Sequence, residues 1–266
     1  MIFASLFPWY GFPGVKPYFD STLTENISGK NPYNKPIRSG NWFNYHIYKN
    51  NPVPPSGPFT LPEKLFCICS GISKFDSDFY YHGYFYRFIV SERFVNFLKE
   101  NKLAEGEYDL CEIEMLSKKL DPLSDKKHYL IRFFKFHDQL FNWQESESIK
   151  KKGSVSNEVY FPSPKLSGIS ETPPFFLLLQ GFLRSAFLCT REIKEKLDKE
   201  KFKGFVMVPV DEYVDVQQFR DNYPMATKEL MQHEDSRWFS KDGYGLAEKA
   251  QIPVKEFTLG TPRNVQ

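Results

Sequence analysis

One stretch, Tyr84 to Lys99, restricts the fold more than any other part of this sequence. Its first half is aromatic or β-branched apart from Arg87, a composition that predicts a strand with at least one buried face. Ser91 follows, and its hydroxyl can accept a hydrogen bond from an N–H group in the first turn of a helix. From Glu92 to about Lys102 the apolar residues fall on one side, which is the pattern of an amphipathic helix. The stretch therefore predicts a strand, a cap and a helix in direct succession.

The same succession is repeated later in the chain. Ser185–Cys189 predicts the end of a strand, Thr190 occupies the position of the cap, and Arg191–Lys201 predicts a second helix. Each helix is followed by an apolar segment with strand character, Tyr108–Met115 after the first and Gly204–Val210 after the second. We therefore expect two strand–helix–strand units, although any α+β chain can contain two such units by chance.

The order of these segments predicts an α+β fold with a mixed, largely antiparallel sheet. Leu65–Ser70 has the composition of a strand, and a proline turn at Asp121–Ser124 should join the strand at Tyr108–Met115 to another at His128–Phe136. These two strands should pair as an antiparallel hairpin. Further strands are expected at Val159–Phe161 and Phe175–Gln180.

Composition also divides the chain into regions, but no linker is polar enough to separate two domains. The N-terminal region alternates aromatic residues with Pro, Gly and Asn, which predicts an irregular layer over the sheet with a short strand at Trp42–Tyr48. Residues 138–157 should form an exposed connection, and a helix is expected at Pro224–His233. The expected organisation is one domain, 1–266, with 1–62 as the irregular layer, 63–210 as the strand–helix core and 211–266 as a helical part and tail.

The charge and the cysteines exclude several classes of protein. There are 35 basic and 33 acidic side chains, a net charge of +2, whereas nucleic-acid-binding proteins usually have a marked basic excess. No apolar run approaches the ~20 residues of a membrane helix, and the first residues lack the basic region of a signal peptide. The four cysteines lie in apolar contexts, so we expect buried, reduced thiols and a cytoplasmic protein.

The sequence offers little for catalysis or metal binding. None of the five histidines shows the spacing of a metal site. Asp76-Ser77-Asp78 lacks the glycine and distal glutamate of a calcium loop, so we expect an ordinary turn with exposed charges. The best enzyme candidate is a Cys111–His137 pair, but the acidic residues around Cys111 should raise the pKa of its thiol. We expect no enzyme, cofactor or metal; a cytosolic hydrolase or transferase and a structural interaction module are the alternatives.

Several segments resemble immunity proteins of bacterial polymorphic-toxin and contact-dependent competition systems. They are the strand ending in Ser91-Glu92-Arg93-Phe94, the strand His128–Phe136, the segment Asp138–Glu145, and the late Lys203-Gly204-Phe205 with Pro209-Val210-Asp211. The resemblance covers about half of the chain, and the first 62 residues resemble no family. Its motifs are structural and contain no catalytic signature.

The resemblance implies a cytoplasmic protein, monomer or homodimer, that neutralises a cognate toxin domain by covering it. Such an interface needs a rigid surface of ~800 Å² per partner, with aromatic or arginine anchors and complementary charge. The acidic segment from Glu105 to Glu114 could face a basic cleft, and Trp143 could anchor a loop contact. The residues expected to bind the partner are Glu107, Asp109, Glu112, Glu114, Trp143, Glu145 and Glu147.

Overall fold

The chain folds into two compact units, which we describe separately. The six-strand unit comprises Gly14–Phe136 and Glu200–Phe205, and the four-strand unit comprises Met1–Pro13, His137–Lys199 and the chain from Val206 onward. The single domain expected over residues 1–266 stays a prediction. The computed structural model describes residues 1–6, 19–39, 42, 61–82, 87–146, 149–150, 159–160, 164–167, 171–178 and 186–211.

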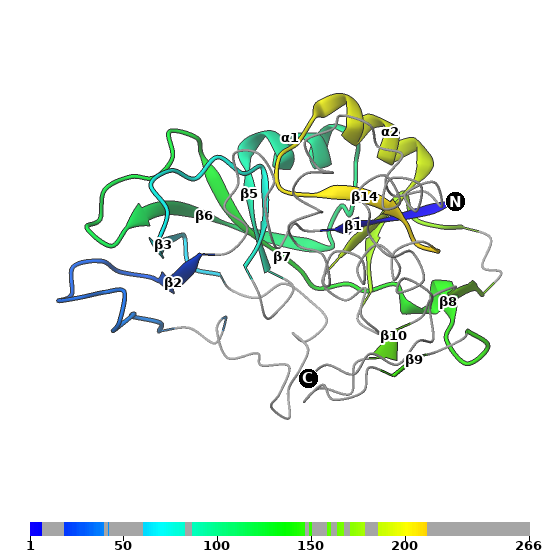
Figure 1. The fold of residues 1–266 in the computed structure, drawn as a ribbon, viewed down its shortest axis with the longest axis horizontal. Coiled ribbons are helices and arrows are strands. Elements are labelled where there is room, and N and C mark those ends of the chain that lie inside the picture. Colours follow the sequence, from blue (N-terminus) through cyan, green and yellow to red (C-terminus); the bar gives the residue numbers. More distant parts are fainter. Residues whose placement is uncertain are drawn as a thin grey trace, which may run out of the picture. The chain divides into compact units, whose positions relative to one another are not determined.

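The six-strand unit is built on one mixed sheet. Its strands are β2 (Asp20–Thr24), β3 (Lys64–Ser70), β4 (Phe79–Tyr81), β5 (Arg87–Ser91), β6 (Tyr108–Ser117) and β7 (His128–Phe133). They lie in the order β2–β3–β6–β7–β5–β4 (Figure 1). Only β3 and β6 are parallel neighbours; the other pairs, including the predicted β6–β7 hairpin, are antiparallel. The predicted α+β fold with a mixed, largely antiparallel sheet is confirmed.

Helix α1 (Glu92–Glu100) begins where the sequence predicts. The Ser91 hydroxyl accepts a hydrogen bond from the backbone N–H of Phe94 at 3.3 Å, so the predicted cap is confirmed. Glu92 lies in the first turn and Lys99 in the last, and both charges complement the helix dipole. The helix buries one apolar face, formed by Phe94, Val95, Phe97 and Leu98.

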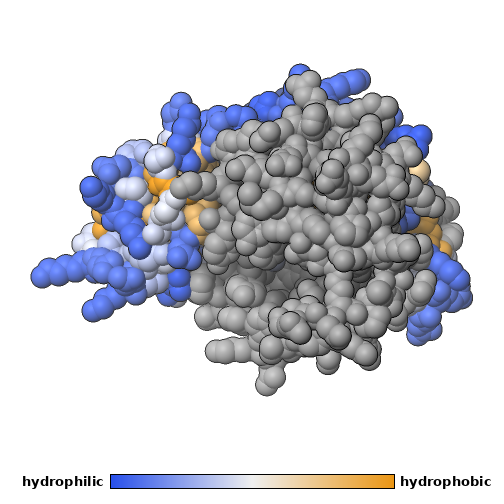
Figure 2. Space-filling view, viewed as in Figure 1, coloured by the Kyte–Doolittle hydropathy of each residue, from blue (hydrophilic) through white to orange (hydrophobic). Residues whose placement is uncertain are grey.

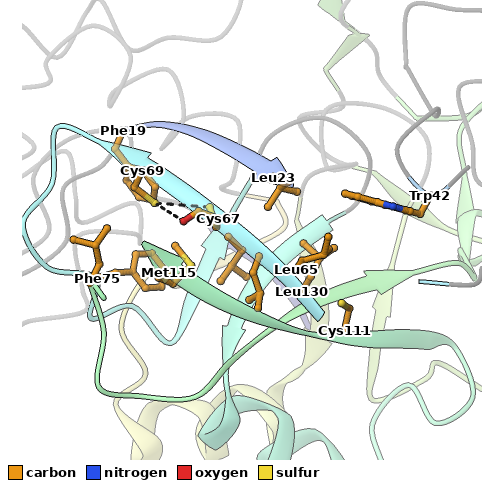
Figure 3. Close-up of a cluster of buried hydrophobic side chains, with 13 residues drawn as sticks. Phe19, Leu23, Trp42, Leu65, Cys67, Cys69, Phe75, Cys111, Met115 and Leu130 are labelled. Atoms are coloured by element: carbon orange, nitrogen blue, oxygen red, sulfur yellow. Dashed lines mark hydrogen bonds between the residues drawn. The ribbon is translucent and has the colours of Figure 1, made fainter. Parts of the chain in front are cut away.

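Successive side chains along each strand point to opposite faces of the sheet, and each face has its own hydrophobic core. One core combines aliphatic residues, three cysteines and aromatic rings; Figure 3 shows Leu65, Cys67 and Cys111 among them, with Trp42 at one side. The core on the other face consists largely of phenylalanine. There Phe79 and Phe94 meet edge-on with ring centroids 4.9 Å apart. This second core also contains Phe88, Phe97, Phe133, Phe202 and Phe205.

The four-strand unit has its own sheet and helix. Its sheet has the order β12 (Phe175–Leu177), β13 (Phe187–Thr190), β1 (Ile2–Leu6) and β14 (Val206–Pro209), with every neighbouring pair antiparallel. Helix α2 (Arg191–Glu200) buries Ile193 and Leu197, as predicted. Smaller elements complete the described part of this unit: the 3₁₀ helix η2 (Asp138–Leu140), β8 (Phe141–Asn142) paired with β11 (Lys165–Leu166), and β9 (Ile149–Lys150) paired with β10 (Val159–Tyr160).

The two units share one topology, which confirms the predicted pair of strand–helix–strand units. Strands β5 and β6, joined through α1, are both antiparallel to β7 between them and are therefore parallel to each other. Strands β13 and β14, joined through α2, flank β1 in the same way. An outer strand, β4 or β12, pairs with the first strand of each set. Because β7 follows its set in the chain whereas β1 precedes its set, the two arrangements are related by circular permutation.

Two predictions about the irregular regions are wrong. The layer predicted for residues 1–62 is not irregular in its described part, where Ile2–Leu6 forms β1 and Asp20–Thr24 forms β2. β1 takes its hydrogen bonds from β13 and β14, which follow much later in the chain, so no local pattern reveals it. The connection predicted as exposed at 138–157 instead buries Leu140 and Phe141 in a core with Phe176 and Leu188. The predicted residues Tyr84–Tyr86, 43–48 and 224–233 lie outside the described residues.

Candidate functional site

Three acids of the segment, Asp109, Glu112 and Glu114, lie on strand β6, and the pleat of the strand divides them between the two faces of the sheet; Glu105 and Glu107 precede the strand. Cys111 and Ile113 point into the buried core. Successive side chains on a strand point to opposite faces, so Glu112 and Glu114 project from the other face. Asp109 shares the face of Cys111. The sequence-predicted acids therefore do not form one surface.

Glu112 and Glu114 form the centre of a mixed patch across three strands. In the register of the sheet, Glu112 lies between Lys64 of β3 and Tyr129 of β7, and Glu114 lies opposite Phe66. Directly paired residues share a face, so these side chains are neighbours on one side of the sheet. We call Lys64, Phe66, Glu112, Glu114, Lys127 and Tyr129 the β3–β6–β7 patch.

Each carboxylate of the patch already holds an ammonium group. Lys64 Nζ lies 2.8 Å from Glu114 and 5.2 Å from the centre of the Phe66 ring. Lys127 Nζ lies 3.3 Å from Glu112 and 5.3 Å from the centre of the Tyr129 ring. The hydrogen bond to Glu114 raises the pKa of Lys64. All four charged side chains are 40–48% exposed, so these pairs are solvated and individually weak.

Asp109 and Glu107, the other two acids of the segment that were predicted to bind the partner, form ion pairs within the six-strand unit. Arg132, only 2% exposed, makes a two-pronged ion pair with Asp109, and its Nε donates to Asp109 Oδ1 at 3.1 Å. Removing one partner from a buried ion pair is strongly destabilising, so Asp109 serves the fold. Glu107 pairs with Lys135 at 2.6 Å and has a side chain only 15% exposed. Whether Asp109 and Glu107 bind a partner stays a prediction. The side chains of Glu112 and Glu114 are more exposed and are therefore the better candidates for contact with a partner.

The remaining predicted contact residues belong to the four-strand unit. The Trp143 indole N–H donates to the Asp138 carbonyl oxygen at 2.9 Å, and its ring packs on Phe141 with centroids 5.2 Å apart. Trp143 is thus partly buried and held in place by its own segment. Glu145 is exposed. Glu147 lies outside the described residues.

The described residues support neither catalysis at Cys111 nor a metal site. Cys111 belongs to the six-strand unit and His137 to the four-strand unit. Burial, with Glu112 and Asp109 contributing, raises the pKa of the Cys111 thiol to about 12, which opposes formation of the reactive thiolate. No group of His, Cys, Asp and Glu side chains within the described ranges could hold a metal ion. Neither described helix has the length and apolar character needed to cross a bilayer.

A comparison with protein families identifies the chain more specifically than its geometry does. The family model for Immunity protein 43 matches residues 11–225, well over half of the sequence. The chain belongs to the Immunity protein 43 family. No curated protein matches the sequence. Membership confirms the predicted resemblance to immunity proteins of toxin systems, and the match extends into the first 62 residues, where the sequence alone suggested no family.

Within the six-strand unit, Asp78 organises a hydrogen-bonded network. The Asp78 carboxylate accepts hydrogen bonds from the Ser91 hydroxyl at 2.8 Å, the Arg93 guanidinium at 2.8 Å and the Lys203 backbone N–H at 2.9 Å. Burial by itself raises the pKa of Asp78, but these hydrogen bonds outweigh it and leave the pKa lowered. The expectation of exposed charges is therefore wrong at Asp78, which is buried.

The Asp78 network fixes a segment that arrives from far along the sequence. The Lys203 carbonyl oxygen accepts hydrogen bonds from the N–H groups of Asp78 and Phe79. Gly204 has φ +115°, and a Cβ placed on it would lie 1.9 Å from the Phe79 carbonyl oxygen. Only glycine suits this close approach. The sequence contains the Lys203-Gly204-Phe205 motif just before an apolar strand. It does not indicate that Asp78 is the residue to which this motif binds.

Proposed function

We propose that this protein binds a cognate bacterial toxin domain and neutralises it by covering it, without catalysis of its own. Membership of the Immunity protein 43 family carries the proposal, because the family description is that of an immunity protein. The raised pKa of the Cys111 thiol adds support by weighing against the one nucleophile suggested by the sequence. The protein acts in the cytoplasm as a monomer or homodimer.

Neutralisation by covering requires a surface that is rigid before the toxin arrives. Ordering a flexible surface on binding lowers affinity, whereas a preformed one avoids that loss. Sheet faces meet this requirement, since the backbone of each inner strand is hydrogen-bonded on both sides. In the six-strand unit, β3 and β6 are inner strands with two partners each, and the Asp109–Arg132 ion pair joins β6 to β7.

Co-expression with a toxin tests the proposal. We expect the adjacent upstream gene to encode a large modular protein, whose toxic C-terminal domain serves as the toxin. We expect cells that make both proteins to grow, and the two proteins to elute together in size-exclusion chromatography with the toxin's mass unchanged. A toxin that is cleaved or chemically modified on incubation would identify an enzyme and contradict the proposal. Continued toxicity with both proteins soluble would contradict binding.

A further inference from the structure

The β3–β6–β7 patch has the chemistry of a surface that recognises arginine. We propose that the toxin docks on this patch by inserting arginine side chains between its carboxylates and aromatic rings. The inference rests on the proposed function and adds the surface and the chemistry of its partner. Its central residues are Phe66, Glu112, Glu114 and Tyr129.

The arrangement places a carboxylate and a ring side by side twice. Glu114 lies opposite Phe66, and Glu112 lies opposite Tyr129. A guanidinium group can pair with a carboxylate through two parallel hydrogen bonds and also stack on an aromatic face. Each half of the patch therefore offers both contacts that an arginine side chain uses. Phe66 and Tyr129 are half-buried, so their rings are held by the sheet while part of each stays accessible.

The free protein shows that these positions accept cations. Lys64 Nζ contacts Glu114 and lies within cation–π range of Phe66, and Lys127 does the same with Glu112 and Tyr129. Both lysines are 46–48% exposed, and such surface pairs contribute little to stability. A strongly hydrated ammonium group returns readily to water, whereas arginine is less hydrated and matches a carboxylate with two donors. A partner's arginines can therefore displace the lysines at small cost.

Position on the sheet explains why the patch lies outside the part of this face that α1 covers. Tyr129 pairs with Val90, and Val90 pairs with Phe79. Phe79 packs under α1 against Phe94, so the helix covers the β4–β5 side of this face. On the β3–β6–β7 side the patch residues are exposed or half-buried, whereas Ile68 and Leu116, further along the same face, are buried. Figure 2 shows that the described residues at the left of the view, where Figure 1 labels β2, β3 and β6, are mainly hydrophilic, with small apolar areas between them. A small aromatic centre within a polar rim is typical of protein interfaces.

Neutral, isosteric variants test the proposal. The double variant E112Q/E114Q removes both charges and keeps side-chain size; E195Q/E200Q, on exposed positions of α2, is the matched control. Using isothermal titration calorimetry with the cognate toxin domain, we expect the Kd of E112Q/E114Q to rise about tenfold to a hundredfold. The control should stay within about twofold of wild type. Urea midpoints should be close to wild type for both variants, because the ion pairs removed are exposed.

The outcomes separate the docking surface from the function. A wild-type protein that binds the toxin while E112Q/E114Q binds equally well overturns the docking surface and leaves the proposed function intact. A wild-type protein that fails to bind overturns the function. In that case a second experiment tests the docking surface. A blocked tri-arginine peptide and its tri-lysine counterpart are titrated into the protein, and backbone amide NMR follows the chemical shifts. Shifts at Phe66, Glu112, Glu114 and Tyr129 with arginine, reduced in F66L, support the surface, and their absence overturns it.

Discussion

Asp78→Ala should destabilise the six-strand unit far more than Asp76→Ala, although the two aspartates are neighbours in one turn. The Asp78 side chain is 4% exposed and accepts from Ser91, Arg93 and the Lys203 N–H. Alanine leaves two donors without this acceptor, the buried Ser91 hydroxyl and the partly buried Lys203 N–H. Arg93 is 48% exposed and can turn to water, so its loss is discounted. At about 1.5 kcal/mol for each of the two donors, the loss is about 3 kcal/mol.

Asp76 supplies the control. It pairs with Lys126 and with Lys203, whose side chains are 40% and 49% exposed. Solvated pairs of this kind are worth less than about 1 kcal/mol. Urea unfolding at neutral pH, followed by far-UV circular dichroism, measures both variants. Amide hydrogen exchange at Phe94 should also accelerate in Asp78→Ala, because the Ser91 cap loses its support. Equal losses in the two variants would refute the reasoning, since burial of Asp78 would then have no energetic consequence.

Three further predictions concern acid, backbone and thiols. The pKa of Asp76 is lowered to about 2, first by its hydrogen bond to Lys126 and then by that to Lys203; its contribution is complete above the ordinary pKa near ~4 and is lost as the pH falls towards ~2. The difference in unfolding free energy between wild type and Asp76→Asn should therefore shrink over that interval, and a constant difference would contradict it. Gly204→Ala places Cβ 1.9 Å from the Phe79 carbonyl oxygen and should lower the free energy of unfolding in urea by more than about 3 kcal/mol. Gly71→Ala, where φ is +82° and the space is open, should lower it by about 1 kcal/mol. All four cysteines are buried, so Ellman's reagent should react with them only after denaturation, and prompt reaction of the native protein would contradict this packing.

Local patterns account for the parts of the fold that were predicted. The strand, the Ser91 cap and helix α1 depend on residues adjacent in the chain, and apolar spacing identified Ile193 and Leu197 as the buried face of α2. The hairpin of β6 and β7 joins consecutive strands through residues 118–127. Resemblance to immunity proteins also rested on these local motifs, and the family match confirmed it.

Strand partners far apart in the chain were not predictable in the same way. Ile2–Leu6 has only ordinary apolar character, and it becomes a central strand because β13 and β14 bond to both of its edges. Asp78 lies in a sequence typical of an exposed turn, yet Lys203 arrives 125 residues later and buries it. Contacts of this kind depend on the closure of long loops, which no local pattern records.

The sequence by itself determined the two helices, the strands beside them and the class of protein, because cap residues and periodic apolar spacing act over one or two turns. The tertiary structure alone decided which acidic residues are available to a partner. Pleating sends Glu112 and Glu114 to the face of the β3–β6–β7 patch, where their side chains are 44% and 40% exposed, and Asp109 to the face of the buried Arg132. A run of like charges in a sequence thus becomes a surface only after strand register assigns each side chain to one side of the sheet.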